Sequence, residues 1–203
     1  MASTGSKQKA VIFVDGNNWY HSLKEAGVSD RLQLDYTRIS RKLVAGREWC
    51  QTRYYIGRVP QGLSTSLYAD QRRFVSLLQA QDKRISVHFG RLEPRRADDA
   101  SAKRLLKYLS ELKTPIDRSV YRDLHDIATE HNEAIVWVEK AVDVNLAMDL
   151  VVMAAGGELD TAYILSADGD YTPAVRMVRS VGKQVIAASC TRGHNSPKPA
   201  TFL

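Results

Sequence analysis

Short apolar runs of four or five residues recur along this chain, and several end in a turn that carries an acidic residue. Val11–Val14 leads into Asp15, and Ala162–Leu165 leads through a short turn to Asp168. Apolar runs of this length, bounded by turns, are typical of buried strands in a parallel sheet. Open α/β sheets hold their active sites at the carboxyl ends of such strands. The pattern therefore predicts an α/β fold with acidic residues gathered at one edge of the sheet.

Helical segments alternate with the apolar runs, which favours a three-layer α/β/α sandwich with a mainly parallel sheet and right-handed crossovers. The predicted strands cover residues 9–14, 51–57, 85–90, 134–138, 162–165 and 183–188. The predicted helices cover residues 19–26, 36–43, 66–81, 143–155 and 173–181. For the helix at 66–81 we expect an apolar stripe of Leu67, Phe74, Leu77 and Leu78.

The stretch from 92 to 133 departs from this alternation. It has helical periodicity over 100–112, a break at Thr114–Pro115, and a second amphipathic segment over 116–129. We expect a helical insertion here, within one domain that spans residues 9–189. The end of the chain, residues 191–203, contains two prolines and is expected to be disordered.

The net charge of the 203-residue chain is +6 at pH 7, although the predicted site is acidic. A basic surface around an acidic cleft suits a protein that holds a cation and attracts a polyanion. Solubility alone could also explain the charge. No segment is apolar enough to span a membrane, no signal peptide is recognisable, and Cys50 and Cys190 form no metal motif. We therefore expect a cytoplasmic protein with reduced thiols.

The acidic residues themselves indicate a metal. Asp143 begins an apolar helix after the run at 134–138, and Asp168 and Asp170 flank Gly169, which would let the backbone turn so that both carboxylates enter one cleft. Two carboxylates about 5 Å apart repel by roughly 3 kcal/mol at an effective dielectric near 20, so several together need either protonation or a cation. Oxygen ligands without His or Cys favour Mg²⁺ or Mn²⁺. The candidate ligands are Asp15, Asp143, Asp149, Asp168 and Asp170.

A simpler interpretation stays open for each acid. Asp and Gly favour turns and helix caps without any function. Asp149 lies within an apolar helix, where a salt bridge or a hydrogen bond would also account for a carboxylate.

Further residues are candidates for binding a substrate. Ser166 offers a hydroxyl at a strand end, and the amides of Asn17 and Asn18 could hold phosphate oxygens. The basic candidates are Lys140, Arg58 and Arg91, beside the predicted edge, with a further basic cluster on the insertion. Trp19, Tyr20 and Tyr171 flank the acidic turns, where aromatic rings could stack on bases.

Three blocks carry a family resemblance: Val14-Asp-Gly-Asn-Asn18, Lys140 to Asp149, and Leu165-Ser-Ala-Asp-Gly-Asp-Tyr171. They resemble, in this order, the signature blocks of the NYN domain, a branch of the PIN-like nuclease superfamily, and its LabA-like bacterial members most. The resemblance implies a PIN-like fold and Mg²⁺- or Mn²⁺-dependent cleavage of RNA. It implies an acidic centre of Asp15, Asp143, Asp168 and Asp170, supported by Asn17, Asp149 and Ser166. The long insertion departs from a compact member, and Ala141 stands where Gly is common.

We therefore predict a metal-dependent endoribonuclease that acts on single-stranded or structured RNA. The alternative is a regulator that binds RNA or proteins through the same fold without cutting, with the insertion as the surface for a homodimer or another protein partner. A small-molecule phosphohydrolase is a third, weaker hypothesis, because the first strand is not followed by Asp-x-Thr or Asp-x-Val.

Overall fold

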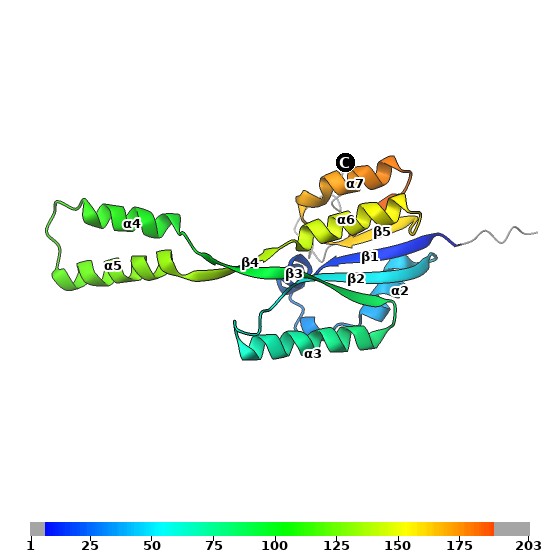
Figure 1. Cartoon of the computed structure of the whole chain (residues 1–203), viewed down its shortest axis with the longest axis horizontal. Helices are drawn as coiled ribbons and strands as arrows, with labels where there is room; N and C mark the ends of the chain where they lie inside the picture. Colours follow the sequence, from blue (N-terminus) through cyan, green and yellow to red (C-terminus); the bar gives the residue numbers. More distant parts are fainter. Residues whose placement is uncertain (1–6, 189–203) are drawn as a thin grey trace, which may run out of the picture. The chain divides into compact units, whose positions relative to one another are not determined.

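Six strands form one sheet in the computed structural model, which describes residues 7–188 of the chain (Figure 1). In the order β4-β3-β2-β1-β5-β6 these strands are β4 (Ile135–Lys140), β3 (Ile85–Arg96), β2 (Glu48–Arg58), β1 (Lys9–Asp15), β5 (Thr161–Leu165) and β6 (Gln184–Ala188). The pairs β1–β2, β1–β5, β2–β3 and β5–β6 are parallel. The predicted mainly parallel α/β fold is therefore confirmed.

The helices are α1 (Gly16–Glu25), α2 (Tyr36–Val44), α3 (Thr65–Gln81), α4 (Ala100–Ser110), α5 (Arg118–Glu133), α6 (Val142–Ala155) and α7 (Thr172–Ser180), with short 3₁₀ turns η1 (Arg31–Gln33) and η2 (Gly169–Tyr171). The side chains of aspartate or serine residues cap the first turns of several of these helices. Asp35 accepts a hydrogen bond from Arg38 N at 2.8 Å, and Ser64 accepts one from Leu67 N at 3.3 Å. These caps satisfy amides that a first helical turn leaves free.

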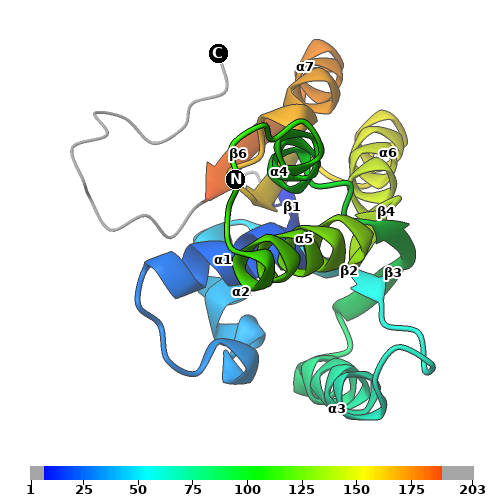
Figure 2. The same cartoon turned by 90° about the vertical axis from the view of Figure 1, so that its left-hand side faces the viewer.

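Two apolar cores lie on opposite faces of the sheet. On one face α6 and α7 cover Val11, Phe13 and Ile164, and on the other face α1, α2 and α3 cover Ile12, Val14 and Tyr54. Figure 2 shows these two groups of helices on either side of the central strands. The alternation of side chains along β1 feeds both cores, because successive residues of a strand point to opposite faces.

The helices that follow β1 and β2 pack on one face of the sheet, whereas the helices on either side of β5 in the chain pack on the other face. Because β1 pairs with β2 on one side and with β5 on the other, its carboxyl end lies at a topological switch point. Ligands of open α/β sheets bind in the crevice at this point. The fold thereby places Asp15, the last residue of β1, in that crevice.

The predicted apolar stripe of α3 was partly wrong. Phe74 and Leu78 are buried against the sheet, but Leu67 and Leu77 are 53% and 52% exposed. Leu67 lies in the first turn, and Leu77 points about 100° around the helix axis from Leu78. Strand β3 is also longer than the predicted 85–90, because its second half pairs with β4.

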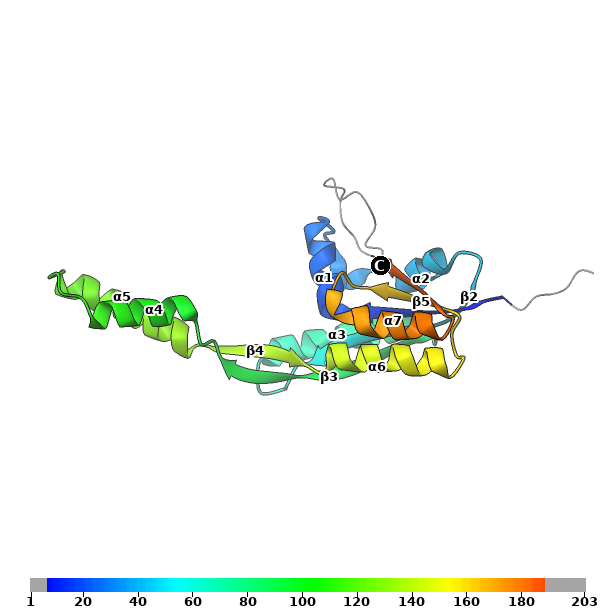
Figure 3. The same ribbon diagram turned by 90° about the horizontal axis from the view of Figure 1, so that it is seen from above.

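Residues 92–139 form a compact unit of their own, and residues 1–91 and 140–203 form the other. The smaller unit contains the end of β3, then α4, α5 and β4, so the predicted helices of the insertion are present. Ala97 N donates to Ala134 O at 2.7 Å, and the arrows of β3 and β4 run in opposite directions (Figure 3). The predicted disordered tail, residues 191–203, lies outside the described residues.

Candidate acidic site at the carboxyl ends of β1 and β5

Asp15 is the centre of the site because its carboxylate is buried, with 3% of the residue exposed. Its Oδ1 accepts a hydrogen bond from Asn18 N at 3.1 Å, which also caps α1. Its Oδ2 accepts from Ser166 Oγ at 3.1 Å and from Tyr171 Oη at 3.0 Å. The register pairs Val14 with Leu165, so Asp15 and Ser166 leave adjacent strands side by side.

Tyr171 joins two of the predicted acids. Its hydroxyl lies 3.0 Å from Asp15 Oδ2 and 3.1 Å from Asp143 Oδ1, so these two carboxylate oxygens are within about 6 Å of each other. The ring is buried against α6, with 1% of the residue exposed. A phenol has one proton, so it can donate to only one of the two carboxylates at a time. The second carboxylate is left to water, to another donor or to a cation, and Asp143 is exposed.

Burial raises the pKa of Asp15 above its ordinary value, and the nearby charge of Asp143 adds to this. Hydrogen bonds from Asn18, Tyr171 and Ser166 offset only part of the effect. The pKa of Tyr171 is raised as well, first by burial and then by the charges of Asp15 and Asp143. Perturbed groups at a switch point mark a functional site.

Asp168 and Asp170 lie at the start of η2. Asp168 Oδ1 accepts a hydrogen bond from Asp170 N at 2.9 Å, and Asp168 N donates to Ser166 Oγ at 3.1 Å. Asp170 is exposed. At Gly169 a Cβ atom would meet open space, and the φ angle is not in the left-handed region. The turn between Asp168 and Asp170 therefore does not require glycine, contrary to the prediction.

The structure separates Asp149 from the other acids. Its Oδ2 accepts hydrogen bonds from Arg53 at 2.7 Å and from Tyr55 Oη at 2.8 Å, with His88 Nδ1 at 4.0 Å. Burial alone would raise the pKa of Asp149, but the bonds from Arg53 and Tyr55 lower it below its ordinary value. The simpler interpretation of Asp149, a salt bridge, is the one found.

The remaining predicted residues fall into three groups: two asparagines, three basic residues and the aromatic rings. Asn18 Oδ1 accepts from Ala167 N at 2.9 Å, which ties the turn after β1 to the turn after β5, while Asn17 is exposed. Arg58 ends β2 and pairs in register with Arg91, which lies in the middle of β3 and not at its end as predicted, because β3 continues to Arg96. Lys140 ends β4. Trp19 and Tyr171 are buried, so the suggestion that these rings stack on bases was wrong.

Sequence reasoning missed the role of Tyr171 as a bridge and the cluster of Arg53, Tyr55 and His88 around Asp149. Tyr55 and His88 stack with ring centroids 4.9 Å apart. Nothing in a linear pattern pairs residues that are about 95 positions apart. The only available signal was that Tyr171 directly follows Asp170.

The acidic site contains few side chains that could hold a metal ion as they stand. Among residues 7–188, no three His, Cys, Asp or Glu side chains lie close enough to hold one ion as they stand. The donors that do converge are hard oxygens, the carboxylates of Asp15 and Asp143, and these suit Mg²⁺ or Mn²⁺ in chemical type.

In the same described range, no helix is long and apolar enough to cross a bilayer.

Comparisons with known proteins agree with this picture. A search of curated proteins gave no match. Among solved structures, a protein of unknown function from Vibrio parahaemolyticus is similar, with a TM-score of 0.53 and 19% identity over 92% of this chain and 83% of that one. That likeness supports the fold. The family model of the NYN domain matches residues 9–201, nearly the whole chain. The chain therefore belongs to the NYN domain family.

Proposed function

We propose that this protein is a metal-dependent endoribonuclease whose acidic centre lies at the carboxyl ends of β1 and β5. The NYN family is a branch of the PIN-like nucleases, which supports a nuclease in general terms. The observation that carries the proposal for this chain is the Asp15–Tyr171–Asp143 bridge. It holds two carboxylates together in a crevice where only one of them can receive the phenol proton.

Asp15 and Asp143 would hold Mg²⁺ or Mn²⁺, with Asp168 and Asp170 as the further carboxylates of the centre. A divalent ion held there would supply activation of water and charge stabilisation for in-line displacement at phosphorus. Ser166 and Tyr171 orient the Asp15 carboxylate by hydrogen bonds. Asp149 is left out of this centre because Arg53 already neutralises its charge.

The substrate side of the proposal depends on charge. The chain is basic overall at +6. Arg58 ends β2, its register partner Arg91 lies within β3, and Lys140 ends β4. These cations attract a polyanion. Asn17, exposed beside Asp15, has a free amide for a phosphate oxygen or a bound water. RNA, single-stranded or structured, is the polymer that we propose.

Three finer points belong to the same proposal. We assign the chain to the LabA-like branch from its signature blocks, and we place it in the cytoplasm from its cysteine usage. A homodimer or another protein would bind through the α4–α5 segment. Each point is separate from the chemistry of the acidic centre.

The experiment is cleavage of a labelled RNA by the wild type and by Asp15→Asn, Asp168→Asn and Tyr171→Phe, with and without Mn²⁺. We expect EDTA to abolish cleavage and added Mn²⁺ to restore it. The two Asp variants should lose at least about a hundredfold in kcat/KM. Tyr171→Phe keeps the buried ring but loses the bridge, so it should need about tenfold more Mn²⁺ for half-maximal activity.

The control is Asp149→Asn, which removes a carboxylate outside the acidic centre and should keep most of the cleavage activity. Equal cleavage by the wild type and both Asp variants would indicate a contaminating nuclease and refute the proposal. RNA binding without turnover at any divalent ion would instead favour the regulator that binds without cutting.

A further inference from the structure

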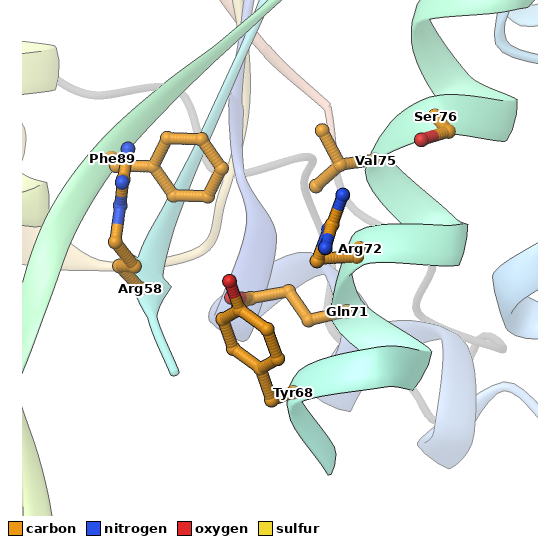
Figure 4. Close-up of a pocket in the computed structure, with 7 residues that line it drawn as sticks. All are labelled: Arg58, Tyr68, Gln71, Arg72, Val75, Ser76 and Phe89. Atoms are coloured by element: carbon orange, nitrogen blue, oxygen red, sulfur yellow. The ribbon is translucent and has the colours of Figure 1, made fainter. Parts of the chain in front are cut away.

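A further pocket lies on the α3 face of the sheet, outside the acidic site. It has a volume of about 220 Å³ and is bounded by the end of β2 and the middle of β3 on one side and by α3 on the other. Its lining residues are Arg58, Tyr68, Gln71, Arg72, Val75, Ser76 and Phe89. Figure 4 shows Tyr68 and Arg72 reaching from α3 toward Arg58 and Phe89 on the strands.

Gln71 holds the backbone on both sides of Arg58. Its Nε2 donates to Gly57 O at 2.7 Å, and its Oε1 accepts from Val59 N at 2.9 Å. The guanidinium of Arg58 then lies over the ring of Phe89, with its central carbon 4.4 Å from the ring centroid. The cation is therefore held in place before any ligand binds, which reduces the entropy lost on binding.

The charge of this pocket is not compensated from within. Arg58 and Arg72 both line it, and no acidic residue does. Within residues 7–188 neither guanidinium forms an ion pair; the contact found for Arg72 is with the Tyr68 ring at 5.9 Å. Two unpaired guanidinium groups favour an anion with several oxygens, such as a phosphate. Two aromatic rings in the same pocket favour a flat group beside that phosphate.

The pocket adjoins a larger cavity of about 510 Å³, which shares Arg58 and Phe89 with it. That cavity is also lined by Arg53, His88 and Asp149, so it leads to the cluster around Asp149. Along β2, Arg58 lies three residues beyond Tyr55, the register partner of Asp15, which is roughly 10 Å in the strand direction.

We propose that Arg58, Arg72, Tyr68 and Phe89 form a subsite for one nucleotide of single-stranded RNA. Arg58 and Arg72 bind its phosphate, and its base stacks on an aromatic ring of the pocket. A duplex keeps its bases stacked inside, so only an unpaired nucleotide can use the rings. The choice of RNA rests on the proposed function, whereas the phosphate and the flat group follow from the pocket itself.

The test is binding without cleavage, measured in EDTA by fluorescence anisotropy with a labelled single strand of about 12 nucleotides. Arg58→Gln and Arg72→Gln should each weaken binding about tenfold and lower the slope of log affinity against log salt by about 0.7. Tyr68→Leu should weaken single-strand binding about tenfold but leave the affinity for a duplex of the same length unchanged.

The matched control is Arg73→Gln. Arg73 follows Arg72 on α3, and its substitution removes the same charge. Arg73 lines a different pocket, together with Leu32 and Asp70. We expect its single-strand affinity to stay within about twofold of the wild type. If Arg73→Gln weakened binding as much as Arg72→Gln, diffuse surface charge would explain the binding and the subsite would be refuted. Equal losses of single-strand and duplex binding in Tyr68→Leu would also refute it.

This outcome is distinguishable from that of the proposed nuclease. If the wild type cleaves RNA but Arg58→Gln and Arg72→Gln bind the single strand normally, the subsite is wrong and the nuclease stands. If both variants lose binding, and neither the wild type nor any variant cleaves RNA with Mn²⁺, the subsite stands and the proposed nuclease activity is wrong.

Discussion

Asp15 combines two roles that pull in opposite directions. Its carboxylate caps α1, yet it is buried next to a second carboxylate, and burial raises its pKa. A carboxyl group whose pKa is higher in the folded state stabilises the fold below its ordinary pKa. That contribution is lost as the pH rises through the raised value. The metal-free protein should therefore lose the stability that Asp15 contributes as the pH rises from the ordinary pKa of an aspartate through the raised value.

Replacing this residue tests the argument. Without metal near pH 7, Asp15→Asn should unfold at a higher temperature than the wild type, and the difference should shrink at lower pH. Thermal unfolding in EDTA across a pH series measures this. Added Mn²⁺ should raise the melting temperature of the wild type only, because a ligand stabilises only the state that binds it. A wild type more stable than the variant at neutral pH in EDTA would contradict the prediction.

At the scale of elements, the start of α6 is strained. Ala141 directly precedes the helix and has φ of 65°, in the left-handed region, with no side-chain cap. That conformation costs a residue with a Cβ atom about 1–2 kcal/mol in the folded state. Glycine avoids this cost, but its greater freedom in the unfolded chain offsets about 0.5–1 kcal/mol of the gain. Ala141→Gly should therefore raise the free energy of unfolding by about 0.5–1 kcal/mol.

Urea unfolding measures this change, and the other end of the same helix provides the control. Gly157 follows α6 with φ of +69° and has open space around a Cβ position. Gly157→Ala should therefore lower the free energy of unfolding by about 1 kcal/mol through backbone strain alone. A loss of stability in Ala141→Gly would mean that contacts of the alanine methyl outweigh the backbone term.

At the scale of the whole molecule, residues 92–139 leave apolar surface uncovered. Val120, Tyr121, Leu124 and Ile127 follow one another at helical spacing along α5, and each is more than a third exposed. A two-helix unit has few ways to cover such a stripe by itself, and exposed apolar patches mark interaction surfaces. We expect the protein to self-associate through this stripe.

Leu124→Glu combined with Ile127→Glu should abolish that association. Light scattering coupled to size-exclusion chromatography should give a dimer mass for the wild type and a monomer mass for the double variant. Cleavage by the acidic centre should persist in the double variant, because its residues belong to the other unit. A monomeric wild type would contradict self-association and leave a different protein as the occupant of the stripe.

The amino-acid sequence by itself determined the strands, the helices and the position of Asp15, Asp168 and Asp170 after apolar runs. Periodicity, caps and turn residues are local, so they can be read along the chain. Only the tertiary structure decided which acids meet. The order β2-β1-β5 brings Ser166 to Asp15, and the packing of α6 over that face directs Asp143 toward Tyr171 and Asp149 toward Arg53. The physical reason is that the chemistry of a side chain determines which groups it can bind. Strand order and helix orientation determine which of those groups lies within its reach.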